Sequence, residues 1–195
     1  MKWGHKVGSG RKRRPGILAA VLITAAWVIA VPQAMAQTAT EDQVKAAFVF
    51  NFVKFVEWPD AAFASGNSSL AICTLGHSAT TDELQAIVHD KVIDGRKLEV
   101  QRLHAPEDVK RCQVVFVANS AAKQQKKLIE AAVGLPILLV AETPGFARAG
   151  GTIDLFVEKG RVGFEVNVTV AVSADLKISS KLLALARIVG TSSGD

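Results

Sequence analysis

The chain has 195 residues with 23 Lys and Arg against 18 Asp and Glu, so its formal net charge is +5. Six of the bases and none of the acids lie in residues 1–36, so residues 37–195 carry 17 bases against 18 acids, a net charge of −1. This nearly neutral remainder lacks the basic footprint of a nucleic-acid-binding protein. Its 159 residues are enough for one domain with its own core.

The first 36 residues have the order of a secretory signal peptide. Six basic residues come first, the apolar run 17–31 follows, and Ala34-Met35-Ala36 offers a cleavage site before Gln37. The run is shorter than the ~20 residues that a bilayer span needs. An uncleaved membrane anchor is the alternative. We expect residues 1–36 to be removed on export, leaving no membrane span, and residues 37–195 to form a single domain.

A helix of unusual hydrophobicity is predicted over residues 41–58, where four of the nine phenylalanines and one of the three tryptophans fall. At about 100° per residue, Asn51, Lys54 and Glu57 form one narrow polar strip. The apolar residues cover more of the circumference than one core-facing stripe needs. Such a helix is buried on two sides, either within one domain or partly against a second protein.

Strands and helices alternate after this segment. Apolar runs predict buried strands over residues 68–75, 112–118 and 136–141, and alternation predicts a half-buried strand over 97–104. Thr80 and Glu83 form a capping box that opens a helix to about residue 91. Residues 106–110 read as a short helical turn, and Ser120 caps a predicted helix over 121–133.

The C-terminal third begins with a Pro- and Gly-rich loop over residues 142–151. Residues 152–158 and 161–168 read as a hairpin around Lys159-Gly160, and 179–189 as an amphipathic last helix capped by Ser179. The whole order predicts an α/β fold: a single three-layer domain whose mixed β-sheet has apolar central strands and a C-terminal antiparallel hairpin, flanked by helices.

Cys73 and Cys112 are the two cysteines of the chain. In an exported protein this even count favours a disulfide. The bond would close a loop of about 40 residues, worth about 4 kcal/mol in the chain-entropy model. Two buried thiols that behave as small hydrophobic side chains are the alternative.

Signals for catalysis are weak. His77, His89 and His104 form no closely spaced pair and have no carboxylate in ligand register, so neither a metal site nor a cofactor is expected. Ser180 and Lys181 are neighbours on a predicted helix and therefore point about 100° apart. With no catalytic residue to assemble, the sequence predicts a protein that is not an enzyme.

A small-ligand site is one alternative function. Gly76, His77 and Ser78 follow a strand and precede a helix, a position where backbone amides can hold an anion. A single glycine there also serves simply as a turn residue. A site at this edge, or at the 142–151 loop, would make the chain a periplasmic ligand-binding sensor that signals to a membrane kinase or transporter.

Glu165 and Asn167 lie on one face of the predicted strand 161–168, with Phe164 and Val166 on the other. A carboxylate and an amide side by side suit contact with a partner. They equally suit hydrogen bonds that fix the following turn.

Two long motifs resemble those of the YfiR family: residues 44–59 (VKAAFVFNFVKFVEWP), and 160–168 (GRVGFEVNV) followed by 176–186 (LKISSKLLALA). Between them, Ile72-Cys73, Gly95-Arg96, Cys112 to Phe116 and Gly150 to Ile153 occur in the expected order. The resemblance covers about residues 41–189.

The resemblance implies a periplasmic regulatory protein. Its named member binds the periplasmic sensor part of an inner-membrane diguanylate cyclase and holds it inactive, which lowers cyclic di-GMP and the output of biofilm and exopolysaccharide. The resemblance also implies an α/β domain that forms a homodimer. Cys73 and Cys112 match one disulfide of the family, and the second disulfide of the named member has no counterpart here.

We therefore expect the first and last helices to provide apolar anchors for a protein interface, with Glu165 and Asn167 near its rim. The candidate interface residues, for the partner or for the dimer, are Phe48, Phe52, Phe55, Trp58, Glu165, Asn167, Ile178, Lys181 and Leu182.

Overall fold

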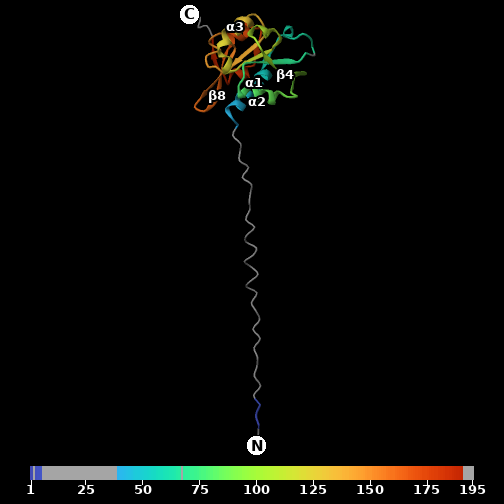
Figure 1. Ribbon diagram of the computed structural model, residues 1–195, viewed down its shortest axis with the longest axis vertical. Coiled ribbons are helices and arrows are strands. Elements are labelled where there is room, and N and C mark those ends of the chain that lie inside the picture. Colours follow the sequence, from blue (N-terminus) through green and yellow to red (C-terminus); the bar gives the residue numbers. More distant parts are fainter. Residues whose placement is uncertain (2, 6–38, 67, 191–195) are drawn as a thin grey trace. The chain divides into compact units, whose positions relative to one another are not determined.

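The computed structural model describes residues 1, 3–5, 39–66 and 68–190 (Figure 1). The apolar run and the cleavage site of the predicted signal peptide lie outside these residues. Within the described part of the chain, no helix combines the length and the hydrophobicity needed to cross a membrane. The elements below all belong to one compact unit, Thr38–Asp195.

An eight-stranded mixed sheet lies at the centre of this unit, in the order β10-β8-β7-β6-β5-β2-β4-β3. Its strands are β2 (Leu70–Leu75), β3 (Val92–Ile93), β4 (Arg96–Leu103), β5 (Val114–Val117), β6 (Leu138–Ala141), β7 (Ile153–Glu158), β8 (Arg161–Asn167) and β10 (Arg187–Val189). Only the β3–β4 and β7–β8 pairs are antiparallel. Every residue of β2, β5 and β6 is buried, which confirms the predicted apolar centre.

Helical segments cover both faces of the sheet, so the predicted three-layer α/β fold is confirmed. Figure 1 shows α1 (Glu41–Phe55) and α2 (Ala79–Val88) on one side and α3 (Gln125–Ala132) on the other. The short helices α4 (Val168–Ser173) and α5 (Ser180–Leu183) join the first side, and the 3₁₀ turns η2 (Pro106–Arg111) and η3 (Asn119–Gln124) the second. A further turn, η1 (Asp60–Ala62), follows α1.

The first helix is shorter than predicted, because its C-terminal end leaves the helix to form a strand. Val56–Glu57 is β1, which pairs antiparallel with β9 (Lys177–Ile178). The β-branched Val56 has extended backbone and lies opposite Ile178, and the N–H of Ser179 donates to the carbonyl of Phe55 at 2.8 Å. A pairing over 120 residues of chain thus ends the helix at Phe55.

The second helix begins two residues before the predicted capping box. Ser78 is its N-cap, and the backbone N–H of Ser78 donates to the hydroxyl of Thr81 at 3.2 Å. The Thr80 hydroxyl, predicted as the cap, donates instead to Asp42 at 2.8 Å and so joins α2 to α1. In the same way Ser120 does not cap a long helix: residues 119–124 are η3, and α3 starts at Gln125.

The predicted last helix is largely wrong. Ser179 does cap a helix, accepting from the N–H of Lys181, but α5 ends at Leu183 and Arg187–Val189 forms β10 beside β8. Leu185, expected on the apolar side of that helix, is 75 % exposed. A short run of apolar residues fits either structure by periodicity, and the pairing with β8 decides for the strand.

The β3–β4 hairpin and the helix α4 are also absent from the sequence-based prediction. The β3–β4 hairpin turns at Asp94 and Gly95, which have φ values of 50° and 78°. Asp-Gly is a strong sequence signal for such a tight turn, so the hairpin was predictable from these two residues. Helix α4 follows Asn167 although four of its six residues are Val or Thr, because Asn167 caps its N-terminus.

The disulfide and the C-terminal hairpin are as predicted. Cys73 in β2 is bonded to Cys112, just before β5, with their Cα atoms 5.8 Å apart and both side chains buried. Strands β7 and β8 form the antiparallel hairpin around Lys159 and Gly160. Because β10 lies beyond β8, the hairpin is not the edge of the sheet.

Candidate functional site

Glu165 lies in the middle of three strands and is 5 % exposed. Its Cα partners are Asp154 on β7 and Arg187 on β10. Arg148, from the 142–151 loop, donates to Glu165 from Nε at 2.8 Å and from Nη2 at 3.0 Å, and Nη1 of Arg187 donates at 3.2 Å. The buried carboxylate therefore binds two guanidinium groups and joins the loop to the edge strand.

Arg187 is fixed by more than Glu165. Its Nη2 donates to Glu158 at 3.1 Å, and its guanidinium carbon lies 4.5 Å from the centre of the Phe156 ring. Glycine at 163 leaves room for that ring, since a Cβ there would come within 2.6 Å of it. We call Arg148, Asp154, Glu158, Glu165 and Arg187 the acid–arginine cluster. With Pro144, Gly145, Phe156 and Val157 it lines an open cavity of about 460 Å³.

The pKa values of the two buried acids of the cluster, Glu165 and Asp154, are shifted in opposite directions. Hydrogen bonds from Arg148 hold the pKa of Glu165 below its usual value, and Arg187 acts in the same direction against the effect of burial. Burial raises the pKa of Asp154, and the charge of Glu165 adds to this, while the N–H of Ala147 acts against it. The pKa of Arg148 is raised by its hydrogen bond with Glu165. The cluster therefore stabilises charge on Glu165 and disfavours it on Asp154.

Asn167 fixes the chain on both sides of β8. Its Nδ2 donates to the carbonyl of Ala147 at 2.9 Å, and its Oδ1 accepts from the N–H of Val170 at 3.1 Å, which caps α4. Asp154 accepts from the N–H of Ala147 at 3.1 Å. Asp154 and Asn167 thus hold the two peptide groups on either side of Ala147 in the 142–151 loop. Of the two interpretations of Glu165 and Asn167, these contacts fit the one in which the side chains form hydrogen bonds that fix neighbouring backbone.

The aromatic residues of α1 are used mainly within the domain. The rings of Phe48 and Phe52 lie 5.4 and 5.1 Å from the ring of Phe164 on β8, between centroids. Helix α1 also packs against α2 and α5. The indole N–H of Trp58 donates to the carbonyl of Gln113 at 3.2 Å. Of the two interpretations of this helix, burial inside one domain accounts for most of its apolar surface.

The nine candidate interface residues divide by exposure. Four are buried: Phe52, Leu182, Glu165 and Asn167. Phe48, Phe55, Trp58 and Ile178 are half-buried, and Lys181 is exposed. The β1–β9 pairing places Val56 opposite Ile178, and the N–H of Ser179 donates to the carbonyl of Phe55, although the two segments are far apart in sequence. We call Phe55, Trp58, Ile178 and Lys181 the β1–β9 surface.

The predicted ligand edge at Gly76, His77 and Ser78 is occupied by the chain itself. The Ser120 hydroxyl accepts from the N–H of His77 at 2.9 Å and donates to its carbonyl at 2.8 Å. Glu142, 5 % exposed, accepts from the Ser78 hydroxyl at 3.1 Å and from the N–H of Asn119 at 3.0 Å. The carboxylate thus sits where the ends of β2 and β5 would offer N–H groups to an anion. Beside it, a polar cavity of about 550 Å³ reaches from His77 to Arg102.

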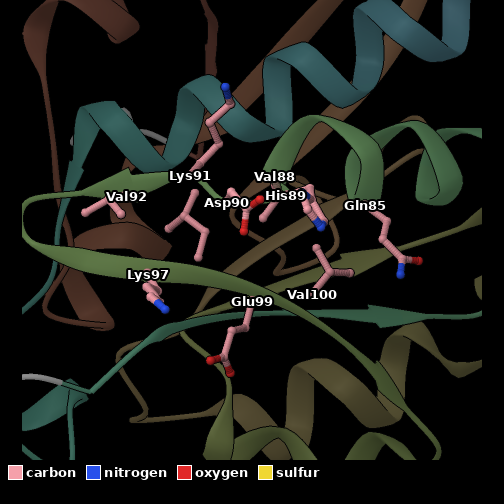
Figure 2. Close-up of a pocket in the computed structure, with 10 residues that line it drawn as sticks. Gln85, Val88, His89, Asp90, Lys91, Val92, Lys97, Glu99 and Val100 are labelled. Atoms are coloured by element: carbon pink, nitrogen blue, oxygen red, sulfur yellow. Dashed lines mark ion pairs between the residues drawn. The ribbon is translucent and has the colours of Figure 1, made fainter.

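A third cavity, of about 320 Å³, lies outside every predicted site. Figure 2 shows its side chains coming from the end of α2, from β3 and from β4. They carry both signs of charge, with His89 and Asp90 paired at 2.9 Å and largely exposed. Among the described residues there is no cluster of three or more His, Cys, Asp or Glu that could hold a metal ion.

Sequence reasoning missed Arg148, Asp154, Arg187 and Glu142. Arg148 and Glu142 belong to a loop that gave no pattern, and Arg187 was assigned to a helix. Asp154 carried a usable signal: it is a charged residue between apolar neighbours in a strand, directly opposite Glu165 if the hairpin turns at Lys159-Gly160.

Comparisons with known proteins give the family. No match is found among curated proteins. Two solved structures are similar to this chain: a conserved domain protein from Vibrio cholerae O1 biovar El Tor (13 % identity, TM-score 0.52, 76 % of this chain and 60 % of that one), which shares the general fold, and the ABC domain in complex with L-Trp from Streptococcus pneumonia (12 %, 0.48, 62 % and 55 %). This chain spans less than two thirds of either structure, and the second likeness is too low to carry an argument.

The model of the YfiR/HmsC-like family matches residues 42–187. This range includes every residue of the acid–arginine cluster and all of α1 except its first residue. The match extends over the whole eight-stranded sheet except the last two residues of β10. The chain therefore belongs to the YfiR/HmsC-like family.

Proposed function

We propose that residues 37–195 act in the periplasm as a regulator that binds the periplasmic sensor part of an inner-membrane diguanylate cyclase and holds the enzyme inactive. The result is less cyclic di-GMP, and so less biofilm and exopolysaccharide. The observation that carries this proposal is the family match over residues 42–187. Members of this family are periplasmic regulators and not enzymes, and the disulfide of Cys73 and Cys112 suits an oxidising compartment.

The β1–β9 surface is the part of the predicted interface that fits this role. Phe55, Trp58 and Ile178 are each half-buried, and Lys181 is exposed near the start of α5. Aromatic anchors are typical of the centre of protein interfaces, and charged side chains of the rim. The antiparallel pairing of Val56 with Ile178 holds the two segments in a fixed relation, which lowers the entropy lost on binding.

Inhibition follows if this surface binds the inactive form of the cyclase more tightly than the active form. Moving an equilibrium from mostly active to mostly inactive requires a preference of about 10⁴-fold between the two forms. Contacts at a few buried anchors can supply such a difference. The homodimer remains a prediction, and it would present two copies of the surface to a dimeric membrane partner.

Substitutions in the buried residues do not test the contact cleanly. Alanine at Phe48 removes a ring that packs on Phe52 and Phe164, and alanine at Glu165 frees Arg148 and Arg187. A loss of repression in either variant therefore has a structural explanation. Lys181→Glu changes an exposed side chain, whereas Ile178→Ala also removes a half-buried side chain that packs against the core opposite Val56. Urea unfolding of the double variant therefore accompanies the capture experiment.

Affinity capture tests the proposal. The mature domain is immobilised and incubated with detergent-solubilised inner membranes, and the eluate is assayed for synthesis of cyclic di-GMP from GTP. We expect the wild type to retain a cyclase, and the double variant Ile178→Ala, Lys181→Glu to lose it. Val133→Ser, a change at an exposed valine directly after α3, is the matched control and should behave as wild type. A wild-type eluate without cyclase activity contradicts the proposed function. Capture of the cyclase by the double variant as well as by Val133→Ser contradicts the assignment of the interface to the β1–β9 surface.

A further inference from the structure

Asp154 is 1 % exposed, and its two oxygens have different surroundings. Oδ2 accepts a hydrogen bond from Ala147, whereas Oδ1 is the one buried side-chain polar atom in the described part of the chain that lacks a partner. An ionised carboxylate in such a place is costly, because burial removes its hydration and the backbone N–H groups of Ala147 and Gly145 offset only part of that loss.

The charged groups around Asp154 do not neutralise it. Glu165 lies opposite on β8, Arg148 comes from the loop, Arg187 from β10, and Glu158 lies further along β7. Both arginines form their ion pairs with Glu165 or Glu158 and none with Asp154. With every group ionised the cluster has a net charge of −1, and protonation of Asp154 brings it to zero.

The same cluster attaches two segments to the β7–β8 hairpin: the 142–151 loop and the edge strand β10. Ala147 is held by Asp154 and Asn167, Arg148 by Glu165, and Arg187 of β10 by Glu165 as well. Phe146, next to these residues, is buried in the core. Loosening Asp154 or Glu165 therefore loosens the attachment of both elements.

We propose that Asp154 is the proton-responsive group of a pH-sensitive latch, which holds the 142–151 loop and β10 most firmly when Asp154 is neutral and Glu165 is ionised. The geometry carries this assignment: a buried carboxyl group with one unpartnered oxygen, placed directly across from a carboxylate that two guanidinium groups already neutralise. The latch is a property of the domain itself and does not depend on the proposed function.

The order of protonation gives the sign of the effect. Burial raises the pKa of Asp154, and the hydrogen bonds from Arg148 lower that of Glu165, so a fall in pH protonates Asp154 first. The buried charge and its repulsion with Glu165 then disappear, and the loop is held more firmly. A further fall protonates Glu165 and releases both arginines. Firm attachment is thus confined to the pH window between the pKa of Glu165 and that of Asp154.

Hydrogen exchange on the whole mature domain tests the latch. Protection of the amides in residues 142–151 is measured from about pH 8 to about pH 4, close to the ordinary aspartate pKa, and corrected for intrinsic exchange. Each unit by which the pKa of Asp154 differs between the closed and open forms changes the opening constant about tenfold. We expect protection to rise by such a factor as pH falls in the wild type, and to be independent of pH in Asp154→Asn.

Glu158→Gln, a change at an exposed member of the cluster, should keep the wild-type pH dependence. Flat protection of the wild type over this range overturns the proposal, whether or not Asp154→Asn folds. An Asp154→Asn variant that keeps the full pH dependence also overturns it, because another group would then be the one that titrates.

Discussion

Asp154 and Glu165 lie directly opposite each other on β7 and β8, and their surroundings move their pKa values in opposite directions. The difference arises because both guanidinium groups of the cluster bind Glu165, while Asp154 is buried with no ion pair of its own and is offered only backbone N–H groups. Two carboxylates with separated pKa values are also found in catalytic sites. Here both are buried beneath a loop that they hold, which is consistent with a structural role.

Glu165→Gln should lower the free energy of unfolding at neutral pH by about 1–3 kcal/mol, since the charged hydrogen bonds to both arginines are weakened. Because the pKa of Glu165 is lowered in the folded state, the stability it contributes is present above the usual glutamate pKa and is lost as pH falls through its folded value. Urea unfolding at several pH values measures this.

The difference between Glu165→Gln and wild type should therefore shrink in acid. Glu158→Gln, whose side chain is 61 % exposed, is the matched control and should change stability by less than about 0.5 kcal/mol. A constant difference across the pH range would mean that the charge of Glu165 does not contribute.

Asn167→Ala should destabilise the domain by about 1–3 kcal/mol, because it removes the cap of α4 and leaves the buried carbonyl of Ala147 without its donor. Asn167→Asp keeps an acceptor for the N–H of Val170 but offers Ala147 no donor, so we expect an intermediate loss. Thermal unfolding of the two variants separates the contributions. Equal stability of Asn167→Asp and wild type would contradict the second hydrogen bond.

Much of the fold follows from local sequence, whereas the cluster does not. The strands β2, β5 and β6 were predicted because continuous apolar runs have few alternatives, and the hairpin because Lys159-Gly160 separates two alternating segments. Arg187 was assigned to a helix because three residues carry too little periodicity. Its contact with Glu165, and that of Arg148, depend on three chain segments meeting, which no local pattern encodes.

The surface prediction was limited in a similar way. The sequence identified α1 as too apolar for one stripe, but it could not count how many neighbours the helix has. The structure gives α2, α5 and β8 as those neighbours, and Phe52 is fully buried among them. The glutamate at 142 shows the same limit, since its place at the ends of β2 and β5 depends on the order of strands in the sheet.

Phe52→Ala should cost about 3–5 kcal/mol, as expected for a ring that is removed from a close-packed core. Phe50, on the same helix, is half-buried beneath Lys54, whose Nζ lies 4.2 Å from its ring centre. Phe50→Ala should therefore cost much less, about 1 kcal/mol. Chemical unfolding of both variants makes the comparison. A similar loss at the two positions would contradict the assignment of α1 to the interior of the domain.

Replacing both Cys73 and Cys112 by alanine should lower stability by about 2–5 kcal/mol. Since both sulfur-bearing side chains are buried, we also expect the folded protein to resist a mild thiol reductant and to react only after addition of urea. Mass spectrometry after alkylation measures the reduced fraction. Rapid reduction of the folded chain would contradict a purely structural role for this disulfide.

The level of cyclic di-GMP in intact cells tests the central claim most directly. In cells that carry the cyclase but lack this chain, the level should rise, and wild-type protein exported to the periplasm should restore it. Val133→Ser should also restore it, and the double variant Ile178→Ala, Lys181→Glu should not, although it folds. A level that is unchanged by loss and return of the wild-type chain would contradict the claim that this protein restrains a diguanylate cyclase.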